Sequence, residues 1–306
     1  MSGKPAPVLN FLGFGEAAST FAAGLAGAGL EGIRAYDVAI HGGRGEALLR
    51  ARARDAGVRL LDGREAFADA DVVFAMVQPA ATLAAAREAA PHLRPGSIFA
   101  DFSSASPTIK QEAARDVEAR GAHYVDLGII GSAAASGHRV AVVAAGREAA
   151  RLRDLFVPYG MNVSVMGETV GAAAGLKLIR SILAKGLEAL YVEALTVAER
   201  TGVTESVLDS FCGFLDAHSA RETAAILMRS HVVHAARRAD EVRMSRGMAI
   251  EAGVEPLMID AIVRVMERTV GAAIPERAAG VAPGTLEDAL AILVEGLPDS
   301  RPRKSK

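Results

Sequence analysis

The chain has 306 residues, of which 51% are hydrophobic and 23% are charged, so it has enough apolar surface for more than one globular core. Its 34 basic and 36 acidic side chains leave a net charge of −2, which excludes the positive footprint of a nucleic-acid-binding or membrane-surface protein. The single cysteine, Cys212, excludes an intramolecular disulfide and a cysteine-rich zinc site, and we expect it to be a packing residue. These features predict two domains, a small-molecule partner and a cytoplasmic location.

The first half of the chain alternates short β-like apolar runs with segments of helical composition. Helical composition marks residues 44–56 and 108–120. This alternation predicts a doubly wound α/β domain of the Rossmann type over residues 1–167, with a parallel sheet covered by helices on both faces. The strands are predicted at residues 8–12, 33–36, 58–61, 71–77, 97–101, 124–127, 139–144 and 162–165.

The β-like runs stop after Gly167, and the remainder has a helical pattern. Residues 168–296 are predicted to form an all-α domain for substrate binding and dimerisation, and residues 297–306 a flexible tail. A helix over residues 170–200 carries apolar side chains around its whole circumference, so it should be surrounded by protein. Ser219 and Glu222 form a capping-box pattern, and Gly253 and Pro256 mark the end of one helix and the start of the next.

The first predicted strand runs directly into a glycine-rich turn followed by a helix of small residues. The glycines allow a tight turn and a close approach of the backbone to a pyrophosphate, which the helix N-terminus would face. The context therefore favours a dinucleotide site over an ordinary glycine-rich turn. The longest apolar stretch here, residues 17–30, is too short to span a membrane, and we do not interpret it as a signal peptide. The GxGxxA pattern comprises Gly13, Phe14, Gly15, Glu16, Ala17 and Ala18.

Asp37 ends the second predicted strand, where an acidic residue can bind the adenosine ribose hydroxyls and repel a 2′-phosphate. This position favours NAD. Two alternatives stay open: Asp37 could be a helix cap, and Arg44 could reach the 2′-phosphate of NADP.

Lys177 and Arg180 lie one turn apart on the same face of the apolar helix. Ionised side chains are seldom buried without partners, so this face is expected to border a polar cleft between the domains. The alternative is that both side chains extend to solvent near the helix start.

The sequence resembles the β-hydroxyacid dehydrogenases, the family of 3-hydroxyisobutyrate and 6-phosphogluconate dehydrogenases. It is most similar to the branch that ends in a phosphogluconate-dehydrogenase-like C-terminal domain of unknown function, and the similarity extends over nearly the whole chain. The segments that carry it are the Gly13 to Gly15 turn, Gln78 with Pro79, Asp101 to Pro107, Asp126 to Ser132 and Gly171 to Lys177.

The resemblance implies a role for each matching position. Lys177 would be the general acid/base, Ser104 would lie near the nicotinamide, and Gln78 and Pro79 would line the cofactor. The substrate carboxylate would bind at Ile130, Gly131 and Ser132.

Two departures from the family pattern affect the substrate contacts, to which we also assign Ser104 and Ser181. The family usually has Ser-Gly-Gly in place of residues 130–132, and Asn in place of Arg180. Arg180 would either lower the pKa of Lys177 by charge repulsion or bind the substrate carboxylate directly.

A basic patch further along the chain carries His231, His234, Arg237 and Arg238. Its spacing is poor for a metal site, so we predict no metal and interpret the patch as a solvated face, with an anionic-substrate contact as the alternative. Asp240 and Glu241 are placed to neutralise the arginines, and His123 and His138 are expected to be structural.

Together these features predict an NAD(P)-dependent oxidoreductase that moves a hydride between nicotinamide and C3 of a small 3-hydroxy acid. The cofactor is expected to be NAD, with NADP possible, and the partners a small anionic substrate and a second copy of the chain. Decarboxylation after oxidation is compatible with the resemblance. The rival functions are an imine reductase, which shares the architecture, and a non-catalytic redox sensor that binds NAD(P) and would not need Lys177.

Overall fold

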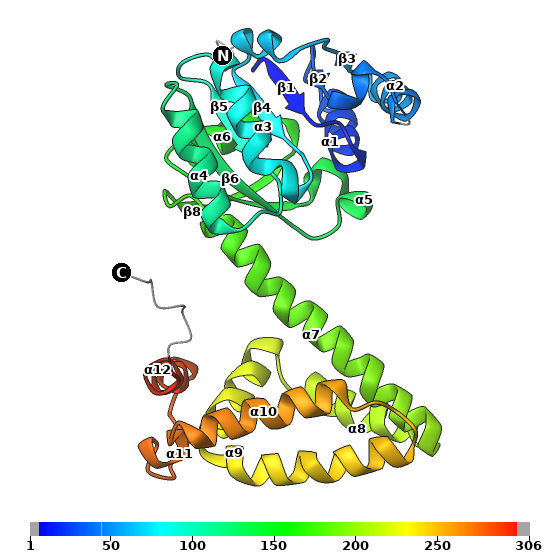
Figure 1. The fold of residues 1–306 in the computed structure, drawn as a ribbon, viewed down its shortest axis with the longest axis vertical. Helices are drawn as coiled ribbons and strands as arrows, with labels where there is room; N and C mark the ends of the chain where they lie inside the picture. The colour runs from blue at the N-terminus through cyan, green and yellow to red at the C-terminus, as the bar shows by residue number, and fades with distance from the viewer. Residues whose placement is uncertain (1–5, 44, 299–306) are drawn as a thin grey trace. The chain divides into compact units, whose positions relative to one another are not determined.

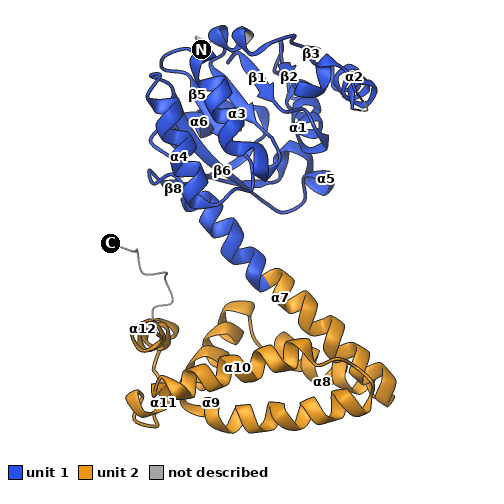
Figure 2. Ribbon diagram, viewed as in Figure 1, with its two compact units in different colours: residues 1–183 blue, residues 184–306 orange. Residues whose placement is uncertain are grey.

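The computed structural model describes residues 6–43 and 45–298 (Figure 1). The chain divides into two compact units, an α/β unit of residues 1–183 and a helical unit of residues 184–306 (Figure 2). The division falls inside one long helix, α7 (Ala172–Thr201). The domain boundary after residue 167 stays a prediction from the sequence.

All eight predicted strands are present and form one sheet in the order β3-β2-β1-β4-β5-β6-β7-β8. The sheet is mainly parallel, as predicted, and contains one antiparallel pair, β6 and β7. The connection between them, residues 131–140, is too short for the crossover that a parallel return requires. The strands are β1 (Leu9–Leu12), β2 (Arg34–Tyr36), β3 (Arg59–Leu60), β4 (Val72–Ala75), β5 (Ile98–Asp101), β6 (His123–Ile130), β7 (Ala141–Ala145) and β8 (Asn162–Gly167).

Strand β1 lies at the point where the strand order reverses. It pairs with β2 on one side and β4 on the other, so successive strands run outward from β1 in both directions. In open α/β sheets a ligand binds at such a point, outside the carboxyl ends of the strands. The segments after Leu12 and Ala75 are therefore expected to line a binding site.

Helices cover both faces of this sheet, as the sequence predicts. The α-helices of the unit are α1 (Glu16–Gly27), α2 (Glu46–Asp55), α3 (Thr82–Ala89), α4 (Pro107–Glu118), α5 (Ala133–Ser136) and α6 (Ala149–Phe156). Its 3-10 helices are η1 (Val38–His41), η2 (Arg64–Asp69), η3 (Pro79–Ala81), η4 (Ala90–His92), η5 (Gly137–Arg139) and η6 (Val157–Tyr159). Figure 1 shows α3 and α4 side by side on one face and α6 behind the strands.

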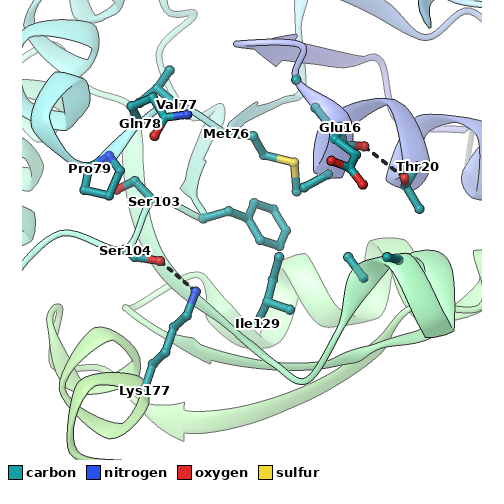
Figure 3. A pocket seen from close by; sticks show the side chains of 16 residues that line it. Glu16, Thr20, Met76, Val77, Gln78, Pro79, Ser103, Ser104, Ile129 and Lys177 are labelled. Atoms are coloured by element: carbon teal, nitrogen blue, oxygen red, sulfur yellow. Dashed lines mark hydrogen bonds between the residues drawn. The ribbon is translucent and has the colours of Figure 1, made fainter. Parts of the chain in front are cut away.

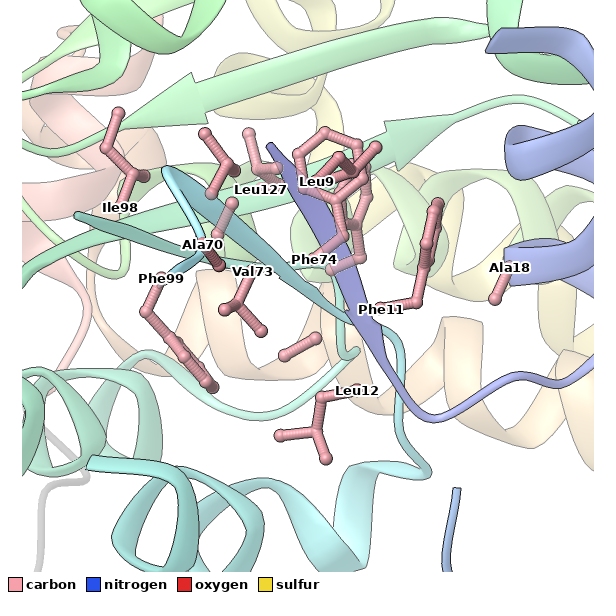
Figure 4. Packing of buried hydrophobic residues seen from close by; sticks show 14 of the residues in the cluster. Leu9, Phe11, Leu12, Ala18, Ala70, Val73, Phe74, Ile98, Phe99 and Leu127 are labelled. Atoms are coloured by element: carbon pink, nitrogen blue, oxygen red, sulfur yellow. The ribbon is translucent and has the colours of Figure 1, made fainter. Parts of the chain in front are cut away.

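Aromatic rings join the helices to the sheet in the core. The Phe74 ring on β4 lies 5.5 Å from that of Phe11, 5.0 Å from that of Phe102 and 4.7 Å from that of Phe156 on α6. Phe102 also contacts Phe21 on α1, with ring centroids 5.4 Å apart. Figure 4 shows Phe11 and Phe74 among these core side chains. Strands β1, β4 and β5 are buried along their whole length, which explains why they are mostly apolar, with Asn10 on β1 and Asp101 on β5 as the polar exceptions.

Within the described residues, the helical unit consists of the later turns of α7 followed by five further helices. The capping box at Ser219 and Glu222 begins α9 as predicted. The buried carboxylate of Glu193 accepts hydrogen bonds from the amides of Met258, at 2.8 Å, and Ile259, at 2.9 Å, and so caps α10. The helices are α8 (Thr204–Asp216), α9 (Ala220–Glu251), α10 (Leu257–Gly271), α11 (Ile274–Arg277) and α12 (Leu286–Gly296).

Much of the apolar surface of these helices is exposed in the single chain. On α7, Val192 in the helical unit is 66% exposed, and Ile182 and Leu183 at the end of the α/β unit are 71% and 73% exposed. The expectation that this helix is surrounded by protein is thus not met within one chain. Among the residues that the structure describes, no helix is both long enough and apolar enough to cross a membrane.

Candidate active site

The glycine-rich turn after β1 has the backbone geometry that a dinucleotide site needs. Gly13 has a φ of +83°, and a Cβ atom there would lie 2.7 Å from the carbonyl oxygen of Met76, so a side chain is excluded. Gly15 faces open space and is the N-cap of α1, without a side chain to bond the first helical amides. These amides therefore stay available for an anionic group such as a pyrophosphate.

Two cavities of about 400 Å³ each adjoin this turn within the α/β unit. Both are lined by Gly15, Met76, Val77 and Gln78, which follow β1 and β4 at the switch point. We call the one that contains Lys177 the lysine cavity (Figure 3), and the one that contains Asp37 the aspartate cavity. Each has the size of a small-molecule site. Together with the turn they suit the two halves of a nicotinamide dinucleotide.

Asp37 lines the aspartate cavity, and its carboxylate also accepts hydrogen bonds from two backbone amides. Its Oδ2 accepts a hydrogen bond from the amide of Phe14 at 2.7 Å, and its Oδ1 accepts one from the amide of Ala39 at 2.9 Å. The capping role considered for Asp37 is therefore present, because it caps η1. A carboxylate has further lone pairs, so Asp37 can still accept from a ribose hydroxyl. Arg44 lies outside the described residues.

An arginine that sequence reasoning missed shares the aspartate cavity. The guanidinium of Arg64 lies 4.7 Å from the centre of the Tyr36 ring and forms an ion pair with Glu88. Its Nε is buried without a hydrogen-bond partner among the described residues. No motif marks this position in the sequence, because the folded sheet brings η2 and α3 to the same cavity.

Lys177 lies on the second turn of α7, and its ammonium nitrogen donates a hydrogen bond to Ser104 Oγ at 2.7 Å (Figure 3). The two residues are 73 positions apart in the chain, so the fold alone makes the pair. Burial lowers the pKa of Lys177, and the nearby charge of Lys110 lowers it further. A lysine that loses its proton more readily than usual is suited to proton transfer.

The predicted site residues fall into three groups: those that line the lysine cavity, those that line the aspartate cavity, and those that line neither. Those that line the lysine cavity are Gly15, Glu16, Ala17, Gln78, Pro79, Ser104 and Lys177, and those that line the aspartate cavity include Gly13 and Asp37. Among the described residues, the predicted substrate contacts that line neither cavity are Ile130, Gly131, Ser132, Arg180 and Ser181. The side chain of Phe14, predicted to contact the cofactor, is buried in the core instead. Ile129 and Ala133 line it from either side of the 130–132 segment.

The positive charge that lowers the pKa of Lys177 comes from a different residue than the Arg180 considered in the sequence analysis. Arg180 is exposed, whereas the cation that lowers the pKa of Lys177 is the fully buried Lys110 on α4. The spacing of Lys110 to Ala113, Ala114 and Val117 puts all four on the buried face of that helix. This spacing is the feature of the sequence that could have indicated a buried Lys110.

The basic patch of the helical unit is partly buried and partly exposed to solvent. His231 Nε2 lies 2.8 Å from Thr269 Oγ1, and burial, followed by the charges of neighbouring arginines, lowers the pKa of this histidine. Arg237 pairs with Glu241, which agrees with the expected neutralisation. His234 is exposed. Within residues 6–43 and 45–298, no group of three potential metal ligands occurs.

The sequence matches known families over both parts of the chain. Residues 10–167 match the NAD binding domain of 6-phosphogluconate dehydrogenase, and residues 198–269 match a domain of unknown function. A conserved hypothetical protein from Sinorhizobium meliloti 1021 is 33% identical over 94% of this chain and 96% of that chain, with a TM-score of 0.61. The conserved protein MTH1747, described as structurally similar to 3-hydroxyacid dehydrogenases, is 31% identical over 87% of this chain and 98% of that chain, with a TM-score of 0.60. L-threonate dehydrogenase from Pectobacterium atrosepticum is 30% identical over 212 residues, which are 65% of this chain and 64% of that protein.

The sheet topology, the glycine-rich turn and the match over residues 10–167 define an oxidoreductase with an NAD-binding domain. The chain belongs to the β-hydroxyacid dehydrogenase family, so the resemblance found in the sequence is confirmed.

Imine reductases share the fold. The imine reductase from Myxococcus stipitatus in complex with NADP+ has a TM-score of 0.71 at 18% identity, covering 95% of this chain and 99% of that chain. A variant of that enzyme binds NAD+. At this identity the likeness concerns the fold alone.

Proposed function

We propose that the protein transfers a hydride between nicotinamide and C3 of a small 3-hydroxy acid, with Lys177 as the general acid/base. The observation that carries this proposal is the Lys177–Ser104 hydrogen bond at the wall of the lysine cavity. A bound nicotinamide would supply the hydride acceptor in oxidation and the donor in reduction. In oxidation, neutral Lys177 takes the proton of the substrate hydroxyl, and in reduction it returns that proton.

Ser104 Oγ accepts a hydrogen bond from Lys177 Nζ and so directs the amine toward the cavity. The substrate hydroxyl would lie within hydrogen-bond reach of both groups. We propose that the 130–132 segment, together with Arg180 and Ser181, contacts the substrate carboxylate. The names 6-phosphogluconate dehydrogenase and L-threonate dehydrogenase both specify acids, which supports an anionic substrate.

We propose NAD over NADP as the cofactor, because the carboxylate of Asp37 repels a 2′-phosphate. Arg64 in the same cavity would favour NADP, but its guanidinium is paired with Glu88. Asp37 therefore repels a 2′-phosphate, and Glu88 occupies the arginine that would otherwise bind it.

We also propose that two copies of the chain associate through the helical unit. The buried cluster of this unit comprises Val232, Ile274, Ala289 and Leu293. By contrast, Val192 is 66% exposed and Val294 78%. Exposed apolar surface of this kind is typical of obligate interfaces. Light scattering across a range of concentrations should give the mass of a dimer, and a monomer at every concentration would refute this.

The decisive experiment follows nicotinamide absorbance while 3-hydroxy acids and semialdehydes are screened with NAD and NADP. Lys177→Met should bind NADH normally and turn over at least about 10²-fold more slowly than the parent. Lys185→Met is the matched control, because it removes an exposed lysine from the same helix. A Lys177→Met variant as fast as the parent would refute the acid/base role.

The same screen separates the rival functions. An imine reductase would reduce cyclic imines and leave hydroxy acids unchanged. A redox sensor would bind NADH and turn over neither class. Lys177 supports the dehydrogenase, because a non-catalytic NAD-binding protein has no need of a half-buried lysine in this cavity.

A further inference from the structure

A second lysine, Lys110, is completely buried behind the lysine cavity. Its side chain is 0% exposed, and its Nζ lies 3.2 Å from Asp101 Oδ2 and 3.2 Å from Asp126 Oδ1. The ammonium group also donates a hydrogen bond to the backbone carbonyl of Asp101 at 2.7 Å. Desolvation of three charged groups is costly, and such clusters often contribute little to net stability. We therefore asked what else this cluster holds in place.

Asp126 holds the beginning of the helix that carries Lys177. Its Oδ2 accepts hydrogen bonds from the amides of Gly171, at 3.0 Å, and Ala174, at 2.9 Å. Gly171 has a φ of +96°, and a Cβ atom there would lie 2.9 Å from Pro107 Cβ. The backbone at the start of α7 is therefore closely packed and leaves no room for a side chain at this position. Lys177 follows Ala174 by one turn, so its position depends on this cap.

Asp101 holds the other partner of Lys177. Its Oδ1 accepts a hydrogen bond from the amide of Ser103 at 2.7 Å, and Ser103 precedes Ser104 in the chain. The hydroxyl of Tyr124 donates a hydrogen bond to Asp101 Oδ2. The two carboxylates that share Lys110 thus fix the two backbone segments whose side chains form the Lys177–Ser104 pair.

We propose that Lys110, Asp101 and Asp126 form a positioning cluster that locks the first turn of α7 to the Ser103–Ser104 loop and thereby sets the geometry of the Lys177–Ser104 pair. The catalytic part of this inference rests on the proposed function, since only that function gives Lys177 a proton to move. The cluster itself does not touch the lysine cavity, so its members are positioning residues.

The cluster also acts through charge. Lys110 repels a second positive charge on Lys177, in the same direction as burial. Arg180, one turn further along α7, is exposed to solvent. Of the other charged groups, Asp101 on β5 and Asp126 on β6 pair with Lys110, and Glu16 on α1 lines the same cavity as Lys177. These groups are acidic, so Lys110 is the one in this set that favours the neutral lysine.

The cap is tested with two variants of one residue. Asp126→Ala removes both contacts to α7, whereas Asp126→Asn keeps an oxygen that can accept them. We expect Asp126→Ala to lower kcat on the order of 10²-fold while NADH binding stays close to that of the parent, and Asp126→Asn to recover most of the loss. A folded Asp126→Ala variant with the parent kcat would overturn the positioning role, as would equal losses in both variants.

The charge is tested without any turnover. The rate of acetylation of Lys177 is measured against pH by peptide mass spectrometry in Lys110→Met and in the control Arg115→Met, which removes an exposed cation from α4. Lys110→Met should move the acetylation curve to higher pH, and Arg115→Met should not. If Lys110→Met does not fold, Lys110→Gln removes the same charge while keeping a hydrogen-bond donor for the two carboxylates, and it should show the same displacement. An unmoved curve would overturn the electrostatic role.

These readouts separate the two hypotheses. If the parent oxidises no hydroxy acid, the proposed function fails, while the acetylation curves still decide whether Lys110 acts on Lys177. If the parent is active and neither Asp126→Ala nor Lys110→Met has its expected effect, the positioning cluster fails alone.

Discussion

The hydrogen bond from Lys177 to Ser104 can be weighed against the proton transfer that it is proposed to serve. Ser104→Ala removes the acceptor of a charge-assisted bond of 2.7 Å. Such bonds contribute about 1.5–3 kcal/mol when well shielded. Because Ser104 is exposed and Lys177 half-buried, water competes for the ammonium group, and we expect the lower end of that range. This corresponds to a loss of roughly tenfold in kcat/KM.

The size of the loss in Ser104→Ala can be compared with that in Lys177→Met. Loss of the acid/base itself should cost about 10²–10⁴-fold, so the two variants should differ by at least an order of magnitude. The assay is steady-state kinetics with the best hydroxy acid from the screen, together with NADH binding by fluorescence. An unchanged kcat/KM in Ser104→Ala, or a loss equal to that of Lys177→Met, would refute the reasoning.

The matched control is Ser97→Ala, at the opposite end of β5. The buried Ser97 hydroxyl donates to the carbonyl of Arg94 at 2.6 Å, well away from both cavities. Its removal should lower the melting temperature by a few degrees, on the order of 1 kcal/mol, without changing kcat/KM.

Three further predictions concern the turn, the cofactor and pH. Gly13→Ala should destabilise the fold by about 1–3 kcal/mol in urea unfolding and weaken NADH binding, because of its positive φ and the 2.7 Å approach to Met76. Gly29→Ala, which has a φ of +94° in open space, should lower stability less and leave NADH binding unchanged. NADH should bind more tightly than NADPH, and Asp37→Asn should narrow the gap by removing charge while keeping an acceptor; equal affinities in the parent would contradict this. Since neutral Lys177 is the active form in oxidation and its pKa is lowered, the acidic limb of the kcat/KM profile should lie below the ordinary lysine pKa, and a limb at the ordinary value would count against the assignment.

The sheet was predictable because its strands are short, apolar and separated by helical segments. All eight were located, although β6 extends to Ile130, three residues beyond the predicted end at residue 127. The antiparallel direction of β7 was not predicted, because strand direction depends on the length of the connection, and the pattern around Ser132 and His138 does not mark where that connection begins. The capping box at Ser219 was predicted because it depends on local chemistry only.

The site was predictable where it depends on local motifs. The glycine-rich turn and Lys177 fall in this class, and both line cavities of the α/β unit. Lys110 was missed because an ionised side chain on an apolar helix face is normally assigned to solvent, and its carboxylate partners come from β5 and β6. Arg64 was missed because its role depends on the packing of η2 beside the Tyr36 ring.

Asp37 has a consequence for how the cofactor would bind. Its carboxylate receives the amide of Phe14 from the glycine-rich turn and also lines the aspartate cavity. A ribose hydroxyl that binds Asp37 therefore competes for the same charge that orients the turn. The adenosine and pyrophosphate portions of a dinucleotide are then thermodynamically coupled, and the coupling is reciprocal. Fragments such as adenosine and pyrophosphate should bind with free energies that do not simply add.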